Sequence, residues 1–259
     1  LPRFEVQLQA PESTPLDREF AVGLTATYYA GGRVAARPIQ WRVTQFPHTF
    51  SPRQRPGFLY SSDGRFSRTE TFESSPRLER QDTTDENGAG RLVLNPAIEP
   101  TSDPRGYVIE ATVTGEDDQT VTATRQVIAL PPFVLGVKLP RYLPEAKEIA
   151  PEVLVVGPDG EPLAGQEVTV RLLHRQWHSV LRASDFTDGV ARYLTDVVDE
   201  QVAERKIRST SEPIRLPFAV SQAGVYVVEV EGADRLGRSQ RVAADLYAGG
   251  TGAVAWARP

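Results

Sequence analysis

Residues 107–113 read YVIEATV, and this short stretch decides the fold class of the chain. Its apolar residues Tyr107, Ile109, Ala111 and Val113 stand at every second position, which is the period of a β-strand with one buried face. The same alternation recurs at residues 4–10, 20–28, 39–43, 168–172 and 226–230, with turn-forming pairs such as Gly31-Gly32 and Asp159-Gly160 in between. Many short strands separated by turns predict an all-β protein built of antiparallel sandwiches.

The stretch is also one half of an internal repeat. Residues 226–232 (YVVEVEG) echo residues 107–113 at an offset of 119 residues. Upstream, residues 160–171 echo residues 32–43 at an offset of 128 residues. Two similar offsets indicate two copies of one unit. We therefore predict two tandem antiparallel β-sandwiches of immunoglobulin-like architecture.

Two prolines mark the junction between the copies. Pro131 and Pro132 are typical of a rigid, extended link. We place the first sandwich at residues 1–130 and the second at residues 131–250. Residues 251–259 start a new apolar alternation that has no partner strand in the chain, and we expect them to begin a following domain.

Two segments depart from the simple strand pattern. Residues 46–82 are rich in proline, serine and arginine, and we interpret them as a long insertion between two strands of the first sandwich. Residues 196–209 allow either a narrow helical stripe or a strand with Val198 and Val202 on one face. The β-rich context favours the strand.

The composition is that of a folded protein. Of the 259 residues, 40% are hydrophobic and 24% are charged, and the formal net charge is −5. This charge offers no basic footprint for nucleic acid, and no apolar run is long enough to span a membrane. The absence of cysteine excludes disulfides, thiolate nucleophiles and cysteine metal sites. Methionine is absent even at position 1, so we expect a piece of a longer polypeptide.

The three histidines do not form a metal or catalytic pattern. His174 and His178 have the i, i+4 spacing of a helical zinc pair, but on a strand these positions lie about 13 Å apart. Arg175, rather than a glutamate, follows His174. His48 lies in the proline-rich segment, and no nucleophile motif accompanies it. We predict no catalytic, cofactor-binding or metal-binding residue.

Two acidic clusters could supply oxygen ligands to calcium. Neither has the alternating ligand spacing of a dedicated calcium loop, so we interpret both as solvated turns. The clusters are Glu116, Asp117 and Asp118, and Asp82, Asp85 and Glu86.

The three tryptophans fall into two groups. Trp41 is in phase with Ile39 and Val43, which predicts a core position rather than a sugar-stacking platform. Trp177 and Trp256 lie near a strand end or a domain junction. We expect both to pack between neighbouring domains.

Several segments resemble the macroglobulin domains of bacterial α2-macroglobulins. These are residues 158–173 (PDGEPLAGQEVTVRLL), 175–178 (RQWH), 219–230 (AVSQAGVYVVEV) and 253–256 (AVAW). Residues 106–114 (GYVIEATVT), with 85–88 (DENG), look like the end of the preceding macroglobulin domain. The resemblance covers nearly the whole chain and is weakest over residues 46–82. It implies seven-stranded sandwiches in a large inhibitor that traps proteases after cleavage of a bait region, with residues 253–256 just before the bait-region domain.

The resemblance therefore implies a non-enzymatic scaffold in the periplasm or cell envelope. The implied partners are neighbouring domains of the same polypeptide, the target proteases of the whole inhibitor and the peptidoglycan synthesis machinery. Covalent trapping in this family uses a Cys-x-x-Gln thioester, which a chain without cysteine cannot contain. We interpret residues 46–82 as an ordinary insertion rather than as a bait region.

Two other functional hypotheses remain open. The first is a tandem immunoglobulin-like surface adhesin or carbohydrate-binding region, which a row of exposed aromatic side chains on one sheet face would favour. The second is an accessory region of an enzyme. Most aromatic residues of the chain instead fall in phase with core positions.

Overall fold

The computed structural model describes residues 3–52, 55–62, 76–187 and 190–250, and the side chains of these residues except 76–77 and 178–196. Its regular elements are strands, joined by one short 3₁₀ helix, and the described residues contain no α-helix. The chain packs into two compact units. Unit 1 comprises Leu1–Phe50, Arg68–Val134 and Asp234–Ser239, and unit 2 comprises Ser51–Ser67, Leu135–Ala233 and Gln240–Pro259.

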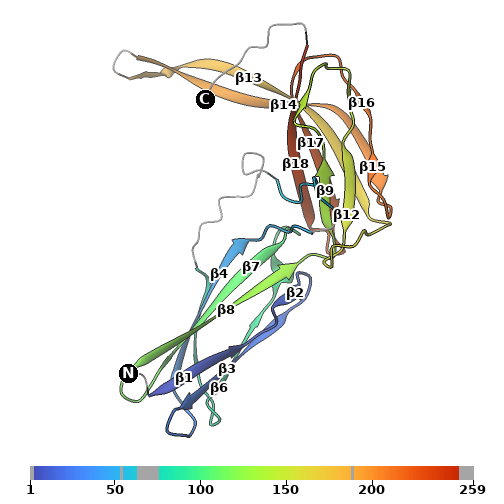
Figure 1. Ribbon diagram of the computed structural model, residues 1–259. Coiled ribbons are helices and arrows are strands. Elements are labelled where there is room, and N and C mark those ends of the chain that lie inside the picture. The colour runs from blue at the N-terminus through green and yellow to red at the C-terminus, as the bar shows by residue number, and fades with distance from the viewer. Residues whose placement is uncertain (1–2, 53–54, 63–75, 188–189, 251–259) are drawn as a thin grey trace. The chain divides into compact units, whose positions relative to one another are not determined.

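Unit 1 is a sandwich of a three-stranded and a five-stranded sheet (Figure 1). The smaller sheet has the order β1-β3-β6, and the larger sheet has the order β2-β8-β7-β4-β5. Neighbouring strands run antiparallel except β2 and β8, which are parallel. The bounds are β1 (Phe4–Gln9), β2 (Ser13–Pro15), β3 (Phe20–Tyr28), β4 (Pro38–Pro47), β5 (Pro76–Thr83), β6 (Ala89–Leu94), β7 (Arg105–Thr114) and β8 (Thr120–Leu130).

The core of unit 1 lies between these sheets, and alternation along the strands builds it. In β3 the residues Phe20, Val22, Leu24 and Ala26 are buried while their neighbours are partly exposed. Trp41 on β4 is 0% exposed, which confirms its predicted core position. The 3₁₀ helix η1 (Pro96–Ile98) then leads into β7.

Unit 2 has a five-stranded sheet with the order β10-β18-β17-β13-β14 and a three-stranded sheet with the order β15-β12-β9. A further short pair, β11 and β16, accompanies them. The bounds are β9 (Val134–Lys138), β10 (Tyr142–Leu143), β11 (Glu148–Ile149), β12 (Glu152–Val156), β13 (Glu167–Thr187), β14 (Val190–Arg208), β15 (Ile214–Arg215), β16 (Phe218–Ala219), β17 (Gly224–Ala233) and β18 (Ser239–Ala248).

The two units have the same strand topology. Taken in chain order, the large sheet of unit 2 repeats the large sheet of unit 1, including a short parallel edge strand, β2 in one and β10 in the other. The small sheets correspond in the same way, with β9, β12 and β15 in place of β1, β3 and β6. The prediction of an all-β chain with antiparallel sandwiches is confirmed.

The limits 1–130 and 131–250 remain a prediction, because the compact units are defined by packing and not by chain order. Unit 1 takes in the turn Asp234–Ser239, and unit 2 takes in Ser51–Ser67 from the predicted insertion. Within unit 2, Leu59 pairs with Val137 of β9 through two backbone hydrogen bonds of 2.8 and 3.0 Å. Part of the insertion is therefore a strand partner of unit 2.

Strand β14 settles the helix-or-strand question for residues 196–209. Val190–Arg208 pairs with β13 along its length, so the prediction of a strand is confirmed. Val202 is the extra residue at a register shift, since Leu172 lies opposite Ala203 and Leu173 lies opposite Gln201. Residues 251–259, with Trp256 and the expected start of a following domain, lie outside the described residues.

Candidate interaction surfaces

His174 has a structural environment. It lies on β13 opposite Tyr226 of β17, and the two rings stack with centroids 4.7 Å apart. Gly224 leaves room for the imidazole, because a Cβ at that position would lie 2.6 Å from the Nε2 of His174. The hydroxyl of Tyr226 donates a 2.7 Å hydrogen bond to the carbonyl oxygen of Gln222. His178 is the second histidine of the i, i+4 pair, and its side chain is not among those that the structure describes.

His48 follows β4 as a half-buried residue. Its backbone N–H donates to the carbonyl oxygen of Pro104 over 3.1 Å. Burial lowers the pKa of the His48 imidazole, because desolvation penalises the charged form. In the part of the chain that the structure describes, His48 and a hydroxyl are not brought together as a base and nucleophile pair.

The acidic clusters order their own turns. Oδ1 of Asp85 accepts hydrogen bonds of 2.8 Å from the backbone N–H groups of Asn87 and Ala89, and Gly88 between them has φ +68°. Oδ1 of Asp117 accepts a longer bond of 3.4 Å from the N–H of Gln119. No three His, Cys, Asp or Glu side chains are grouped to hold a metal ion among the residues that the structure describes.

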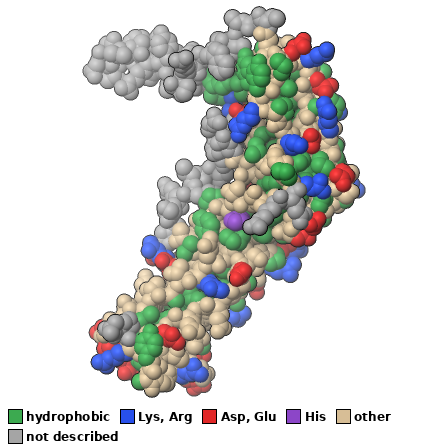
Figure 2. All heavy atoms as spheres, in the orientation of Figure 1, with side chains coloured by type: hydrophobic (Ala, Val, Ile, Leu, Met, Phe, Trp, Pro, Cys, Tyr) green, Lys and Arg blue, Asp and Glu red, His purple; other side chains and the backbone are tan. Residues whose placement is uncertain are grey.

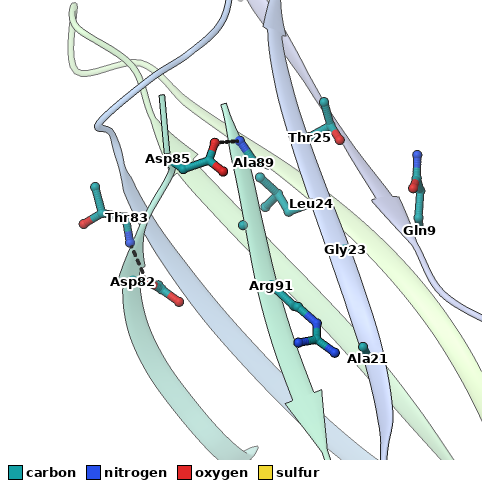
Figure 3. A pocket seen from close by; sticks show the side chains of 11 residues that line it. Gln9, Ala21, Gly23, Leu24, Thr25, Asp82, Thr83, Asp85, Ala89 and Arg91 are labelled. Atoms are coloured by element: carbon teal, nitrogen blue, oxygen red, sulfur yellow. Dashed lines mark hydrogen bonds between the residues drawn. The ribbon is translucent and has the colours of Figure 1, made fainter. Parts of the chain in front are cut away.

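A shallow cavity of about 660 Å³ opens in unit 1 between the edge strands β5 and β6. Figure 3 shows Asp82 and Asp85 beside it, each bound to a backbone N–H, with the Arg91 side chain on the neighbouring strand. The Asp82 carboxylate also accepts a 3.0 Å bond from Arg80. The carboxylates of Asp82 and Asp85 are thus engaged in local hydrogen bonds. The cavity brings together no set of groups for acid–base chemistry among the described residues.

The hairpin of β13 and β14 extends well beyond its sheet (Figure 1). Strand β17 pairs with β13 only from Thr169 to Arg175, whereas β14 stays paired as far as the Thr187–Val190 position. Residues 176–187 and 190–198 therefore form a two-stranded ribbon, called the ribbon below. Trp177, the residue expected to pack between domains, is 40% exposed at the root of the ribbon.

Hydrophobic side chains gather at this root. Of the eleven large hydrophobic residues that are exposed among the described ones, four lie on β13 and β14. Figure 2 shows hydrophobic side chains where the hairpin leaves the sheet. The four residues are Trp177 (40% exposed), Val197 (50%), Val198 (47%) and Val202 (45%).

A row of charges crosses the large sheet of unit 2 next to the ribbon. Arg171 on β13 contacts Glu204 of β14 at 2.9 Å and reaches Glu229 and Glu231 of β17 at 3.0 and 2.5 Å. Arg241 on β18 contacts the same two β17 glutamates at 3.3 and 3.6 Å. Further along β13, Arg175 holds Asp199 through two bonds of 2.7 and 2.6 Å.

The ion pairs of this row, called the network below, shift the pKa values of two of its members. Hydrogen bonds to Glu231 and Glu204 raise the pKa of Arg171. Burial by itself would raise the pKa of Glu231, but its hydrogen bond to Arg171 and the charge of Arg241 outweigh burial, so the pKa of Glu231 is lowered. The ion pairs therefore favour the charged forms of Arg171 and Glu231.

Sequence reasoning missed both the network and the ribbon. A signal for the ribbon was present, because Asp188-Gly189 is a typical two-residue hairpin turn between two alternating runs. The network had a weaker signal, since its members are spread over four segments that only the strand register aligns.

Exposed aromatic side chains do not form a row among the described residues. Tyr29 (67% exposed) follows β3, Tyr142 (60%) lies on β10 and Trp177 (40%) lies on β13. Tyr142 stacks on Tyr247 of the neighbouring strand with centroids 6.0 Å apart. A carbohydrate platform is expected to line up several such rings on one face.

Within the described ranges of the chain, no helix is long and apolar enough to cross a membrane.

Comparison with known proteins identifies the type of domain. Residues 136–249 match the family described as Bacterial macroglobulin domain 6. The chain is 23% identical to an alpha-2-macroglobulin homolog of Nostoc sp., an alignment that covers 98% of this chain and 13% of that protein.

Solved structures show the same fold. The native conformation of Escherichia coli alpha-2-macroglobulin matches 96% of this chain with a TM-score of 0.63 and 17% identity, over 16% of its own chain. Salmonella alpha-2-macroglobulin reacted with methylamine matches 96% of this chain with a TM-score of 0.60 and 18% identity, over 17% of its own chain. The chain therefore spans less than a fifth of the length of these relatives. Residues 136–249 match a bacterial macroglobulin domain, and the fold over nearly the whole chain is that of the alpha-2-macroglobulin structures.

Proposed function

We propose that the chain is a non-enzymatic scaffold segment of a bacterial alpha-2-macroglobulin-like protease inhibitor. The observation that carries this proposal is the match of residues 136–249 to bacterial macroglobulin domain 6. The repeated strand topology of units 1 and 2 supports it, because a repeat of one sandwich is expected of tandem macroglobulin domains.

The proposed mechanism is mechanical. Buried apolar faces and cross-strand ion pairs keep each sandwich rigid, so a conformational change elsewhere in the inhibitor moves it as a body. Protease trapping belongs to the longer polypeptide, of which the chain would supply two domains at residues 1–130 and 131–250 and the start of a third at residues 251–259. Its direct partners are then neighbouring domains, and target proteases engage the whole inhibitor.

The same proposal includes a location. We infer a periplasmic or cell-envelope protein, with the peptidoglycan synthesis machinery as a further partner of the parent. Cell fractionation with an antibody against residues 1–259 tests the location, and recovery of the protein in the cytoplasmic fraction would contradict it.

Incubation with proteases tests the function. The 259-residue chain and the protein encoded by its complete open reading frame are each incubated with trypsin and elastase, and the residual cleavage of a large protein substrate is measured. We expect inhibition by the complete protein and neither inhibition nor hydrolysis by the 259-residue chain. Dose-dependent inhibition by the 259-residue chain alone would show that it carries an inhibitory site of its own.

A further inference from the structure

The ribbon presents apolar side chains on both of its faces. Trp177 and Val197 are paired in register, so they share one face, and Val198 follows on the other face. All three are between 40% and 50% exposed. The pairing of β13 with β17 ends at Arg175, so beyond this residue the ribbon consists of β13 and β14 alone.

Such a ribbon is poorly stable by itself. A two-stranded hairpin in water is marginal, because neither face is covered and each edge leaves backbone groups unpaired. The pairing of β13 and β14 nevertheless continues past β17 to the Thr187–Val190 pair, with one irregularity between Leu181 and Phe186. A surface that packs against the ribbon would supply the missing cover.

We expect the partner to contact the faces of the ribbon and not the free edge of β14. Next to the ribbon, at residues 200–208, the free edge of β14 is interrupted by the extra residue Val202 and carries mixed charges, which discourage strand addition there. Those charges are Glu200, Glu204, Arg205, Lys206 and Arg208. At the root of the ribbon, Asp199 neutralises Arg175 through two hydrogen bonds. The partner surface is therefore expected to be apolar and weakly charged.

The area of the ribbon face indicates whether the partner is a separate protein or a domain of the same polypeptide. Two strands spaced about 4.8 Å apart over roughly ten residues present a face on the order of 300 Å². A stable complex between separate chains buries about 800 Å² per partner. A domain in the same polypeptide instead meets the ribbon at an effective concentration of about millimolar, so a small contact suffices. The relatives are long enough to supply it, since the chain covers only 13% of the Nostoc protein.

We propose that the ribbon docks through Trp177, Val197 and Val198 against an apolar groove of another domain of the same parent polypeptide, outside residues 1–259. This inference rests on the proposed function in one respect, namely that the chain is part of a longer protein. It does not depend on whether that protein inhibits proteases.

The absence of cysteine from the 259 residues allows a direct test. Val198→Cys places one thiol on the proposed contact, and Val93→Cys on β6 is a matched control, since both are strand valines with 47% and 40% exposure. Both variants are made in the 259-residue chain and in the protein encoded by the complete open reading frame. Alkylation by a maleimide is followed over time by mass spectrometry of the peptide that contains each thiol.

We expect the two thiols to react at similar rates in the 259-residue chain. In the complete protein, a contact occupied about 90% of the time slows alkylation of Val198→Cys about tenfold, while the Val93→Cys rate stays nearly unchanged. Equal alkylation of Val198→Cys in both proteins, or equal slowing at both positions, would overturn the inference. Slowing in the 259-residue chain that grows with its concentration would identify a second copy as the occupant and would overturn it as well.

The two proposals fail separately. If the complete protein inhibits proteases but does not slow the alkylation of Val198→Cys, only the ribbon contact is overturned. A docked ribbon in a complete protein without inhibitory activity would overturn only the proposed function.

Discussion

Tyr226 shows how one side chain can close a sandwich of this kind. Its ring is buried at 2% exposure and stacks on His174, while its hydroxyl reaches back four residues to the carbonyl oxygen of Gln222. A tyrosine that bonds back to upstream backbone in this way fixes the entry to its strand. Tyr107 occupies the equivalent place in unit 1, where its hydroxyl contacts Glu99 over 3.3 Å.

The first prediction concerns this hydroxyl. Tyr226→Phe keeps the ring stack and removes only the bond to Gln222, which leaves a carbonyl without its partner. We expect a loss of about 0.5–1.5 kcal/mol in the free energy of unfolding. Urea denaturation measures it, with Tyr29→Phe as the control, because Tyr29 is 67% exposed. Equal effects of the two substitutions would contradict a role for the hydrogen bond.

At the scale of elements, the strand register of unit 1 places a glycine under an aromatic ring. Gly106 on β7 lies opposite Phe46 on β4, and a Cβ at Gly106 would come within 2.1 Å of the Phe46 ring. The ring atoms Cζ, Cε1 and Cε2 all lie within 2.6 Å of this position, so a methyl group could be accommodated only by moving the β4 side chain.

Gly106→Ala is therefore expected to destabilise unit 1 by about 1–3 kcal/mol through overpacking. Gly23→Ala is the matched control on β3, because the nearest atom to its added Cβ would be 3.9 Å away. Thermal denaturation of both variants compares them. A Gly106→Ala variant as stable as Gly23→Ala would mean that the Phe46 ring is free to move.

The charge row across unit 2 predicts how its stability depends on pH. The pKa of Glu231 is lowered in the folded state from an ordinary value of 4.5, so its ion pairs stabilise folding above about pH 4.5. As the pH falls through the lower folded pKa, Glu231 takes up a proton and this stabilisation is lost. We expect the unfolding free energy of unit 2 to decrease on acidification below pH 4.5.

Arg171→Met provides the comparison, because it removes a partner that Glu231 shares with Glu204 and Glu229. The variant should be less stable at neutral pH and should lose less stability on acidification. Arg208→Met is the control, since the Arg208–Glu167 pair has side chains that are 68% and 79% exposed and contributes little. Parallel pH profiles for Arg171→Met and the unsubstituted chain would refute this assignment.

At the scale of the whole molecule, each unit has its own two sheets and its own buried residues. Trp41 lies in the core of unit 1, and Tyr226 lies with Val228 and Val230 in unit 2. Units with separate cores are expected to respond separately to core substitutions.

Truncation of these two aromatics tests the division. Trp41→Ala is expected to lower the stability of unit 1 by about 3–5 kcal/mol and to leave unit 2 nearly unchanged, and Tyr226→Ala is expected to do the reverse. Hydrogen exchange resolved by peptide measures each unit during denaturation. If either substitution unfolded both units together, the chain would behave as one cooperative body.

The sequence by itself determined the fold class, the repeat and the type of domain at residues 136–249, because all three depend on local periodicity and on residues close together in the chain. Alternation at Tyr107, Ile109 and Ala111 already specifies a strand and its buried face. The choice of a strand for residues 196–209 followed from the same β-rich pattern, and β14 covers these residues up to Arg208.

Only the tertiary structure decided which strands meet and where a sheet stops. Arg171 finds glutamates from positions 204, 229 and 231 because the register of β13, β14 and β17 aligns them, and the sequence pattern does not encode that register. Likewise, Trp177 lies in an exposed ribbon because β17 ends its pairing with β13 at Arg175, two residues earlier. Alternation predicts a face for each strand, but burial of that face depends on neighbouring strands that are distant in the sequence.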